Sequence, residues 1–189
     1  MSIQYLKISN FKSIDSLELR NINDFSVFAG ANGSGKSNFF DALDFVSRFI
    51  RFGLTDALRG HGGFDNIHSV KRLENEARRF EFEIECILPD DSTSAQYKYR
   101  LVIQALDTEP EINEQLFIDE KPAITRALDP VDYSVLFTFP RSPLSTLLKN
   151  VRVYRIEPFG ASAPDQSDQD SSLLKRNGHN LPSVLKRLE

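Results

Sequence analysis

Hydrophobic and polar residues alternate in short runs along the N-terminal part of the chain. The runs at residues 3–8, 13–19 and 25–29 have the period of two that is typical of strands. Polar breaks at residues 10–13 and 21–24 separate these runs. The pattern therefore predicts three short strands before residue 30.

The pattern changes to a helical period from Asn38 onward. One apolar stripe contains Phe39, Leu43, Val46 and Ile50, with Phe45 and Phe49 widening it; the opposite polar stripe contains Asp41, Asp44, Arg48 and Arg51. Apolar residues at this spacing face one side of a helix. The sequence predicts an amphipathic helix that buries one face against a large partner. Residues 52–75 are rich in Gly, Asp and Asn, and predict a loop with a short helical turn.

Alternation returns strongly after this loop. Phe80, Phe82, Ile84 and Cys86 alternate with glutamates, and the next run alternates Tyr97, Tyr99, Leu101 and Ile103 with Lys98 and Arg100. Glutamates on one strand opposite cations on the next suit an antiparallel pair with one solvated face. Residues 111–119 and 132–139 are predicted to be further strands of the same antiparallel meander.

The C-terminal part is predicted to contain two helices and a strand. Residues 142–150 are predicted to form a short helix, with Ser142 as its cap and Pro143 in its first turn. A strand at 151–156 and a mobile loop at 157–172 follow. Leu181, Val184, Leu185 and Leu188 have helical spacing behind Asn180, a residue typical of caps.

Composition restricts the class of protein. The 189 residues carry a net charge of −4, so no overall basic field indicates a nucleic acid partner. The single cysteine, Cys86, cannot form an internal disulfide and fits a reducing compartment; it is expected in the core rather than as a nucleophile. No apolar run approaches the ~20 residues of a membrane helix. We therefore expect a cytoplasmic globular protein without a membrane contact. The 15 phenylalanines are interpreted as core residues.

The segment "GANGSGKS", residues 30–37, matches G-x-x-x-x-G-K-[ST], the phosphate-binding loop. Gly30, Gly33 and Gly35 allow backbone N–H groups to converge on phosphate oxygens, and the helix that begins there adds its positive dipole end. Lys36 would reach the β- and γ-phosphates, and the Ser37 hydroxyl would ligate Mg²⁺. A glycine-rich strand-to-helix turn with an incidental lysine is the alternative. The setting between a predicted strand and helix favours ATP with Mg²⁺.

The residues "YLKISNFKSIDSLEL … FSVFAGANGSGKSNFFDALDFV" resemble the N-terminal opening of the ABC-class ATPases of the SMC, RecF and OLD type. The resemblance implies that the whole loop binds nucleotide: Gly30, Ala31, Asn32, Gly33, Ser34, Gly35, Lys36, Ser37 and Asn38. It further implies that Lys12 and Ser13 lie near the phosphates and sugar. A hairpin turn at 10–13 with a solvated lysine explains these two residues equally well. Asn32 is also a residue that tolerates left-handed turns.

Hydrolysis requires carboxylates that hold the metal and orient the attacking water. The run "LFIDE" at 116–120 imitates a Walker B strand that ends in Asp119 and Glu120. A turn between two meander strands is favoured instead, because central parallel strands have longer apolar runs and "DEKP" suits a hairpin. The family's signature is not found before residue 116. Gln104, Gln166 and Gln169 are alternative positions for its Q-loop glutamine.

The fold class expected from these observations is α/β, a P-loop NTPase resembling the N-terminal lobe of an ABC ATPase head, with an antiparallel β meander and an incomplete core. Residues 1–189 would form one N-terminal portion of such a head: 1–52 with the strands, loop and first helix, 76–156 as the meander, 157–172 as a mobile loop and 173–189 as the start of a helical lobe. His61, His68 and His179 are expected to be exposed loop residues rather than metal ligands.

Two functions follow as hypotheses. The first is ATP binding, with Lys36 as the catalytic residue and hydrolysis in the complete or dimeric protein, which the resemblance links to DNA repair, DNA maintenance or antiphage defence. A homodimer or a partner protein would complete the ATPase; the sequence does not indicate DNA directly. The second is a non-hydrolytic nucleotide-sensing scaffold that signals to a partner protein. No N-K-x-D motif supports a GTPase.

Overall fold

The computed structural model describes residues 2–67, 78–90, 93–105, 109–156, 158–159 and 173–186. The chain divides into two compact units, Met1–Val151 and Arg152–Glu189, which are described separately. The predicted loop at 157–172 lies largely outside the described residues, as do His68, Gln166 and Gln169. None of the described helices combines the length and the apolar character needed to cross a membrane.

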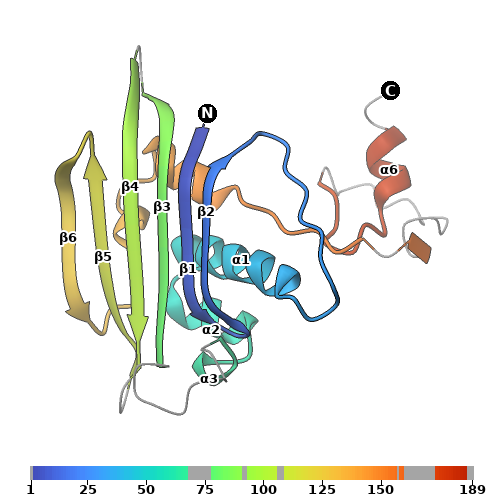
Figure 1. Cartoon of the computed structure of the whole chain (residues 1–189), viewed down its shortest axis with the longest axis horizontal. Coiled ribbons are helices and arrows are strands. Elements are labelled where there is room, and N and C mark those ends of the chain that lie inside the picture. Colours follow the sequence, from blue (N-terminus) through green and yellow to red (C-terminus); the bar gives the residue numbers. More distant parts are fainter. Residues whose placement is uncertain are drawn as a thin grey trace. The chain divides into compact units, whose positions relative to one another are not determined.

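A single antiparallel sheet dominates the first unit (Figure 1). Its strands run in the order β2-β1-β3-β4-β5-β6, and each neighbouring pair is antiparallel. The strands are β1 (Ser2–Phe11), β2 (Ile14–Ile22), β3 (Arg79–Asp90), β4 (Thr93–Gln104), β5 (Glu111–Ile118) and β6 (Lys121–Asp129). The predicted strands at 3–8, 13–19, 80–86 and 97–103 are confirmed, as is the strand at 111–119.

The pairing of β3 with β4 follows from their charges. Glu83 lies opposite Arg100, and Glu85 lies opposite Lys98. The Lys98 ammonium is 2.8 Å from a Glu83 oxygen and 2.7 Å from a Glu85 oxygen. The hydrogen bonds to these two carboxylates, first that to Glu83, raise the pKa of Lys98 above its ordinary value. The predicted antiparallel pair with one solvated face is confirmed.

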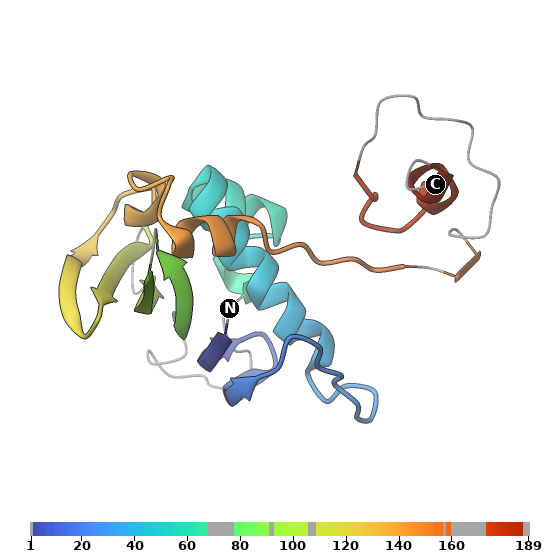
Figure 2. The ribbon, with the colours of Figure 1, turned by 90° about the horizontal axis from the view of Figure 1, so that it is seen from above.

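Helix α1 (Lys36–Phe52) packs its apolar stripe across the other face of the sheet (Figure 2). Phe45 and Phe49 are fully buried. The Phe45 ring lies 6.1 Å from that of Phe11 on β1 and 5.5 Å from that of Phe80 on β3. Burial of each such ring stabilises the fold by about 1.5–3 kcal/mol. The sheet therefore fixes the direction in which α1 and the loop before it point.

The segment before the loop corrects the prediction of a third strand. Residues 25–29 have no regular secondary structure and belong to no strand of the described sheet. The side chains of Phe25 and Val27 are 83% and 75% exposed. Their alternating pattern is typical of a strand, but a strand also requires a neighbour whose main chain pairs with it. The predicted third strand is therefore wrong.

Two more predicted strands are wrong. Residues 132–139 instead contain a short 3-10 helix, η2 (Val135–Phe137), and residues 151–156 have no regular structure. The loop expected over 52–75 contains two short helices, α2 (Leu54–Gly60) and α3 (Phe64–Ile67).

The phenylalanines are divided between core and surface, so their interpretation as core residues holds only in part. Seven are buried: Phe11, Phe39, Phe45, Phe49, Phe64, Phe80 and Phe82. Seven are exposed: Phe25, Phe28, Phe40, Phe52, Phe137, Phe139 and Phe159.

Residues 130–139, which we call the strap, connect β6 to the helices. The buried Glu114 carboxylate on β5 accepts hydrogen bonds from the Ser134 hydroxyl (2.5 Å) and the Val135 N–H (2.9 Å). Asp132 receives the N–H of Leu54 on its carbonyl (2.8 Å) and that of Thr55 on its carboxylate (2.6 Å). The strap therefore joins the meander to the junction of α1 and α2.

Helix α4 (Pro143–Lys149) confirms the predicted helix at 142–150 and lies beside α1. The hydroxyl of Ser47 in α1 donates to the carbonyl of Val151 just after α4 (3.2 Å). Ser142 occupies the predicted cap position, but its hydroxyl is buried without a hydrogen-bond partner in the described structure.

In the second unit, α6 (Leu181–Lys186) lies within the helix predicted behind Asn180. The Asn180 side chain is buried and bonds to the segment before it, accepting from the Lys175 N–H (2.6 Å) and donating to the Leu173 carbonyl (3.0 Å). Asn180 stands directly before α6, its carbonyl accepts the Val184 N–H (3.1 Å), and its side chain ties the preceding segment to the start of the helix.

Candidate functional site

The loop at residues 30–37 leads directly from the exposed segment 25–29 into α1. Gly33 and Gly35 have φ values of +82° and +91°, a region that side chains with a Cβ rarely adopt. Gly35 occupies the N-cap position of α1 and makes no side-chain capping hydrogen bond. The first turn carries no acidic residue. Unpaired amides and the positive end of the helix dipole at this place suit an anion.

Lys36 closes over the loop in this structure. Its ammonium donates to the carbonyls of Gly30 (2.6 Å) and Ala31 (2.7 Å) and to the Ser34 hydroxyl (3.1 Å). A Cβ at Gly30 would lie 3.1 Å from the Ser34 Oγ, so a side chain there would crowd the lysine's partner. All three hydrogen bonds of the ammonium group are therefore made to oxygens of the loop itself. Phosphate oxygens in the loop could replace them as acceptors.

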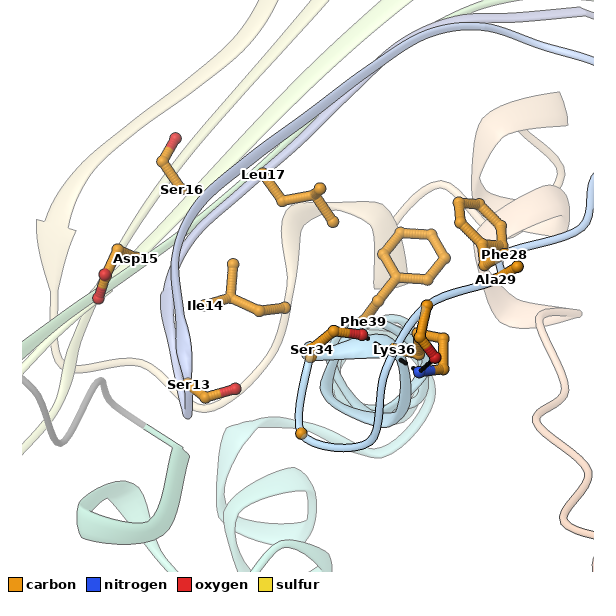
Figure 3. A pocket seen from close by; sticks show the side chains of 13 residues that line it. Ser13, Ile14, Asp15, Ser16, Leu17, Phe28, Ala29, Ser34, Lys36 and Phe39 are labelled. Carbon is orange, nitrogen blue, oxygen red and sulfur yellow. Dashed lines mark hydrogen bonds between the residues drawn. The ribbon is translucent and has the colours of Figure 1, made fainter.

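A cavity of about 650 Å³ lies between the loop and the start of β2 (Figure 3). The residues that line it are Ser13, Ile14, Asp15, Ser16, Leu17, Phe28, Ala29, Gly30, Gly33, Ser34, Gly35, Lys36 and Phe39. Polar groups of the loop occupy one side, and Ile14, Leu17 and Phe39 form an apolar wall. A cavity that is cationic at one end and apolar at the other fits a nucleotide, whose phosphates and base differ in the same way.

The turn between β1 and β2 contributes to this cavity through Ser13. The Asn38 side-chain amide donates to the Ser13 hydroxyl (2.6 Å), which ties the turn to the first turn of α1. Lys12 takes another direction: its ammonium lies 2.7 Å from the Asp41 carboxylate and is absent from the cavity lining. The structure brings Ser13 to the loop and pairs Lys12 with α1.

The remaining predicted residues of the loop are placed at its rim. Ala31, Asn32 and Ser37 are exposed, and Ser37 lies in the first turn of α1, next to Lys36. These three residues do not line the cavity described above.

Sequence reasoning missed the apolar wall. Their local patterns predict only that Ile14, Leu17 and Phe28 lie in strands and that Phe39 lies in a helix. The Phe28 and Phe39 rings lie 5.0 Å apart. The one available signal was the closeness of Phe28 to the motif in sequence, because a residue two positions before the loop cannot lie far from a bound phosphate.

The structure settles the two readings of "LFIDE" in favour of a turn. Asp119 and Glu120 connect β5 to β6 and have positive φ values of 48° and 64°, as in a tight hairpin. The Asp119 carboxylate accepts the Gln96 N–H (2.9 Å) on neighbouring β4. Neither residue lines the cavity. The Walker B interpretation of residues 116–120 is therefore wrong.

The histidine predictions have mixed outcomes. His61 is partly buried rather than exposed, with a side chain that is only 7% exposed: its Nε2 lies 3.3 Å from the Asp44 carboxylate, and its ring packs edge-on against Phe45. His179 is exposed as expected. No group of three or more His, Cys, Asp or Glu side chains with metal-binding geometry occurs among the described residues. Gln104 pairs with Glu111 at the end of β4 and does not line the cavity.

Comparison with known proteins adds a family to this geometry. Residues 25–185 match the family described as "AAA domain, putative AbiEii toxin, Type IV TA system". The chain belongs to this AAA-domain family. No curated protein matches the chain.

The AAA-domain match begins at Phe25, immediately before the phosphate-binding loop, and covers the α1 helix and the strands β3 to β6. Together with the six-stranded antiparallel sheet, it supports an α/β fold of the P-loop NTPase type. An AAA domain is a nucleotide-binding, ATPase-type domain. Ser13 in the β1–β2 turn and Ile14 and Leu17 of β2 precede the matched region, whereas Phe28 and Phe39 lie within it.

Proposed function

We propose that this chain binds ATP with Mg²⁺ and that the assembled protein hydrolyses it, as in the SMC/RecF/OLD-like ATPases that its N-terminal part resembles. One observation carries the proposal: three ammonium donors of Lys36 point into a glycine loop at the uncapped start of α1, beside a cavity with an apolar wall. The phosphates would lie in the loop, and the base would lie against Leu17 and Phe28.

In this arrangement the chain's own groups bind and orient the nucleotide. Lys36 would move from the Gly30 and Ala31 carbonyls to the phosphate oxygens, and the first-turn amides of α1 would hold the same phosphates. Mg²⁺, held at the Ser37 hydroxyl, would neutralise charge on the phosphates. Asn38 positions the Ser13 hydroxyl, through their 2.6 Å hydrogen bond, at the edge of the cavity.

Hydrolysis needs a carboxylate that orients the attacking water. Among the described residues that line the cavity, Asp15 is the only acid, and Figure 3 shows its carboxylate pointing away from the loop. We therefore assign binding to this chain, and we assign turnover to an assembly in which a second copy or a partner protein supplies that group. The family's description supports antiphage defence more than DNA maintenance as the setting.

A non-hydrolytic, nucleotide-sensing module is the second candidate. The observation that favours it is the hairpin turn at Asp119 and Glu120, which removes the carboxylates that the sequence offered for hydrolysis. Both candidates require nucleotide binding and differ only in turnover.

The test is titration with fluorescent ATP, with and without Mg²⁺, on the wild type and on Lys36→Ala. Removal of a charged hydrogen-bond donor costs about 1.5–3 kcal/mol, so affinity should fall about ten- to a hundredfold. Tripolyphosphate should compete with ATP in the wild type, because the loop holds the phosphates. Lys121→Ala, at an exposed lysine in the β5–β6 hairpin, is the matched control and should bind as the wild type does.

Equal ATP affinity in the wild type and in Lys36→Ala would overturn the proposal. Phosphate release by the purified chain, or by its mixture with a full-length homologue, separates the two candidates. Turnover that Lys36→Ala abolishes supports an ATPase, and binding without turnover in both samples supports the sensing module.

A further inference from the structure

The strap presents aromatic side chains to solvent. Tyr133, Phe137 and Phe139 are 54%, 47% and 51% exposed. The Tyr133 and Phe137 rings lie 5.3 Å apart and are inclined by only 33°. Large apolar side chains rarely gather on a surface without a function.

These rings are held outward by buried neighbours. Ser134 and Val135 bond to the Glu114 carboxylate, and the Ser134 hydroxyl also accepts the Leu136 N–H (3.1 Å). Because residues 134–136 are buried, the residues on both sides of them are directed to solvent. The aromatic surface is thus built by a fixed anchor, and its geometry exists before any partner binds.

Two cations lie against this surface. The Lys149 ammonium is 5.6 Å from the centre of the Phe137 ring, and the Arg51 guanidinium is 4.9 Å from that of the exposed Phe52. The hydrogen bond from the Leu54 N–H to the Asp132 carbonyl brings the Arg51–Phe52 pair near the Phe137–Lys149 pair. Phe52 lies two residues before Leu54, and Tyr133, whose ring is 5.3 Å from that of Phe137, directly follows Asp132. Within the described ranges, neither Arg51 nor Lys149 forms a salt bridge.

The local charge contrasts with that of the whole chain. The chain carries a net charge of −4, yet no Asp or Glu occurs from Tyr133 to Ile156. Arg141 and Lys149 lie in the part of this stretch that belongs to the first unit. Cations without acidic partners, placed beside exposed rings, attract a ligand that is both anionic and aromatic.

We propose that this surface, formed by Arg51, Phe52, Tyr133, Phe137, Phe139 and Lys149, binds single-stranded nucleic acid. Unpaired bases stack on aromatic side chains, and Lys and Arg hold the phosphates between them. A duplex hides its base faces, so single strands are the preferred form. The surface lies at the C-terminal end of α1, and the phosphate loop lies at its N-terminal end about 25 Å away for a 17-residue helix. The proposal does not depend on ATP binding.

The test is fluorescence anisotropy with labelled oligothymidylate of about 30 nucleotides and with a duplex of the same length, over about 50 to 200 mM salt. The single strand should bind more tightly. Phe137→Ala should weaken it about five- to a hundredfold by loss of stacking. Lys149→Gln should lower the slope of log K against log salt by about 0.7, the value for one released phosphate contact in a single strand.

Two control variants match these changes. Lys121→Gln removes an exposed lysine from the β5–β6 hairpin, and Phe25→Ala removes an exposed phenylalanine from outside the strap. Both should bind the oligonucleotide as the wild type does. Because Phe137 and Lys149 are not buried, their variants should keep the wild-type urea midpoint, which verifies that they fold.

Four results would each overturn the proposal: no binding by the wild type, equal affinity for the duplex, equal weakening by the control variants, or displacement of the oligonucleotide by polyglutamate at the same charge concentration. The last result would indicate an acidic protein partner, since it would show that charge alone is recognised.

Discussion

The buried carboxylate of Glu114 gives the sharpest prediction about the fold. It lies on the inner face of β5 and accepts four hydrogen bonds, from the Tyr99 hydroxyl (2.5 Å), the Ser134 hydroxyl (2.5 Å), the Val135 N–H (2.9 Å) and Arg126 (3.1 Å). Burial, and then the neighbouring Glu114 charge, raise the pKa of Tyr99 well above its ordinary value, so the phenol remains a donor throughout the range of stability.

Glu114→Ala would leave these donors without their acceptor. Each unsatisfied buried donor costs about 1–3 kcal/mol, and the loss of one member of a buried ion pair costs about 3–5 kcal/mol. Arg126 retains its bond to the Tyr133 carbonyl and is partly open to solvent, which places the expected loss within about 3–5 kcal/mol rather than above it. At about 2–4 °C per kcal/mol for a chain of this length, the melting temperature should fall by about 6–20 °C.

Urea unfolding followed by circular dichroism measures this loss. Glu114→Gln keeps the volume and an acceptor for Tyr99, and should lose roughly half as much stability. Glu111→Ala, at the start of the same strand, should change stability by less than about 0.5 kcal/mol. If Glu114→Ala loses no more than Glu111→Ala, the strap is not anchored by this carboxylate, and the description of the aromatic surface fails with it.

Two further outcomes are expected. Gly53→Ala should destabilise the chain by about 1–3 kcal/mol or more, because Gly53 has a φ of +94° and its new Cβ would overlap the Asp132 carboxylate. In urea unfolding, the double variant Gly53→Ala with Asp132→Ala should regain the part of the lost stability that this overlap causes. An unaltered urea midpoint in the Gly53→Ala variant would contradict this geometry. Burial raises the pKa of the Cys86 thiol to about 12, so the native chain should resist thiol reagents at mildly alkaline pH and react only on unfolding. Because this folded-state pKa lies above the unfolded value of about 8.5, the associated stability is complete below about pH 8.5 and declines towards pH 12, by up to about 1.4 kcal/mol per pH unit. Cys86→Ala should show a shallower decline between those values, and identical pH profiles would refute the assignment.

Helix α1 and the β3–β4 pair were predictable because the hydrophobic pattern within each segment is sufficient to specify it. The stripe that contains Phe39, Val46 and Ile50 specifies a helix with one buried face whatever covers it. The alternation of glutamates with Phe82 and Ile84 likewise specifies which face of β3 is solvated. Local patterns of this kind need no information about the rest of the chain.

The strap was not predictable for the opposite reason. Residues 132–139 alternate as a strand does, but in the structure Ser134 bonds to the buried carboxylate of Glu114. The alternation of residues 111–119 gives no sign that this carboxylate is buried. Only the completed sheet creates a buried acceptor at that position. The same holds for the cavity, whose apolar wall exists because the Asn38–Ser13 bond brings the β1–β2 turn to the loop. The phosphate-loop motif can be predicted from contiguous residues, whereas the apolar wall of the cavity depends on a contact between residues 25 positions apart in the sequence.

The stretch Phe25–Ala29 has a practical consequence for work with this chain. This stretch belongs to no strand of the described sheet, and its Phe25 and Val27 side chains are largely exposed, so it can pack against the same apolar stretch of another copy. Concentrated samples are therefore expected to associate through these apolar side chains, and the contacts would form directly beside Gly30. Any such aggregate would obstruct or reshape the entrance to the nucleotide cavity, so affinity should depend on protein concentration, and dilution series belong with every titration.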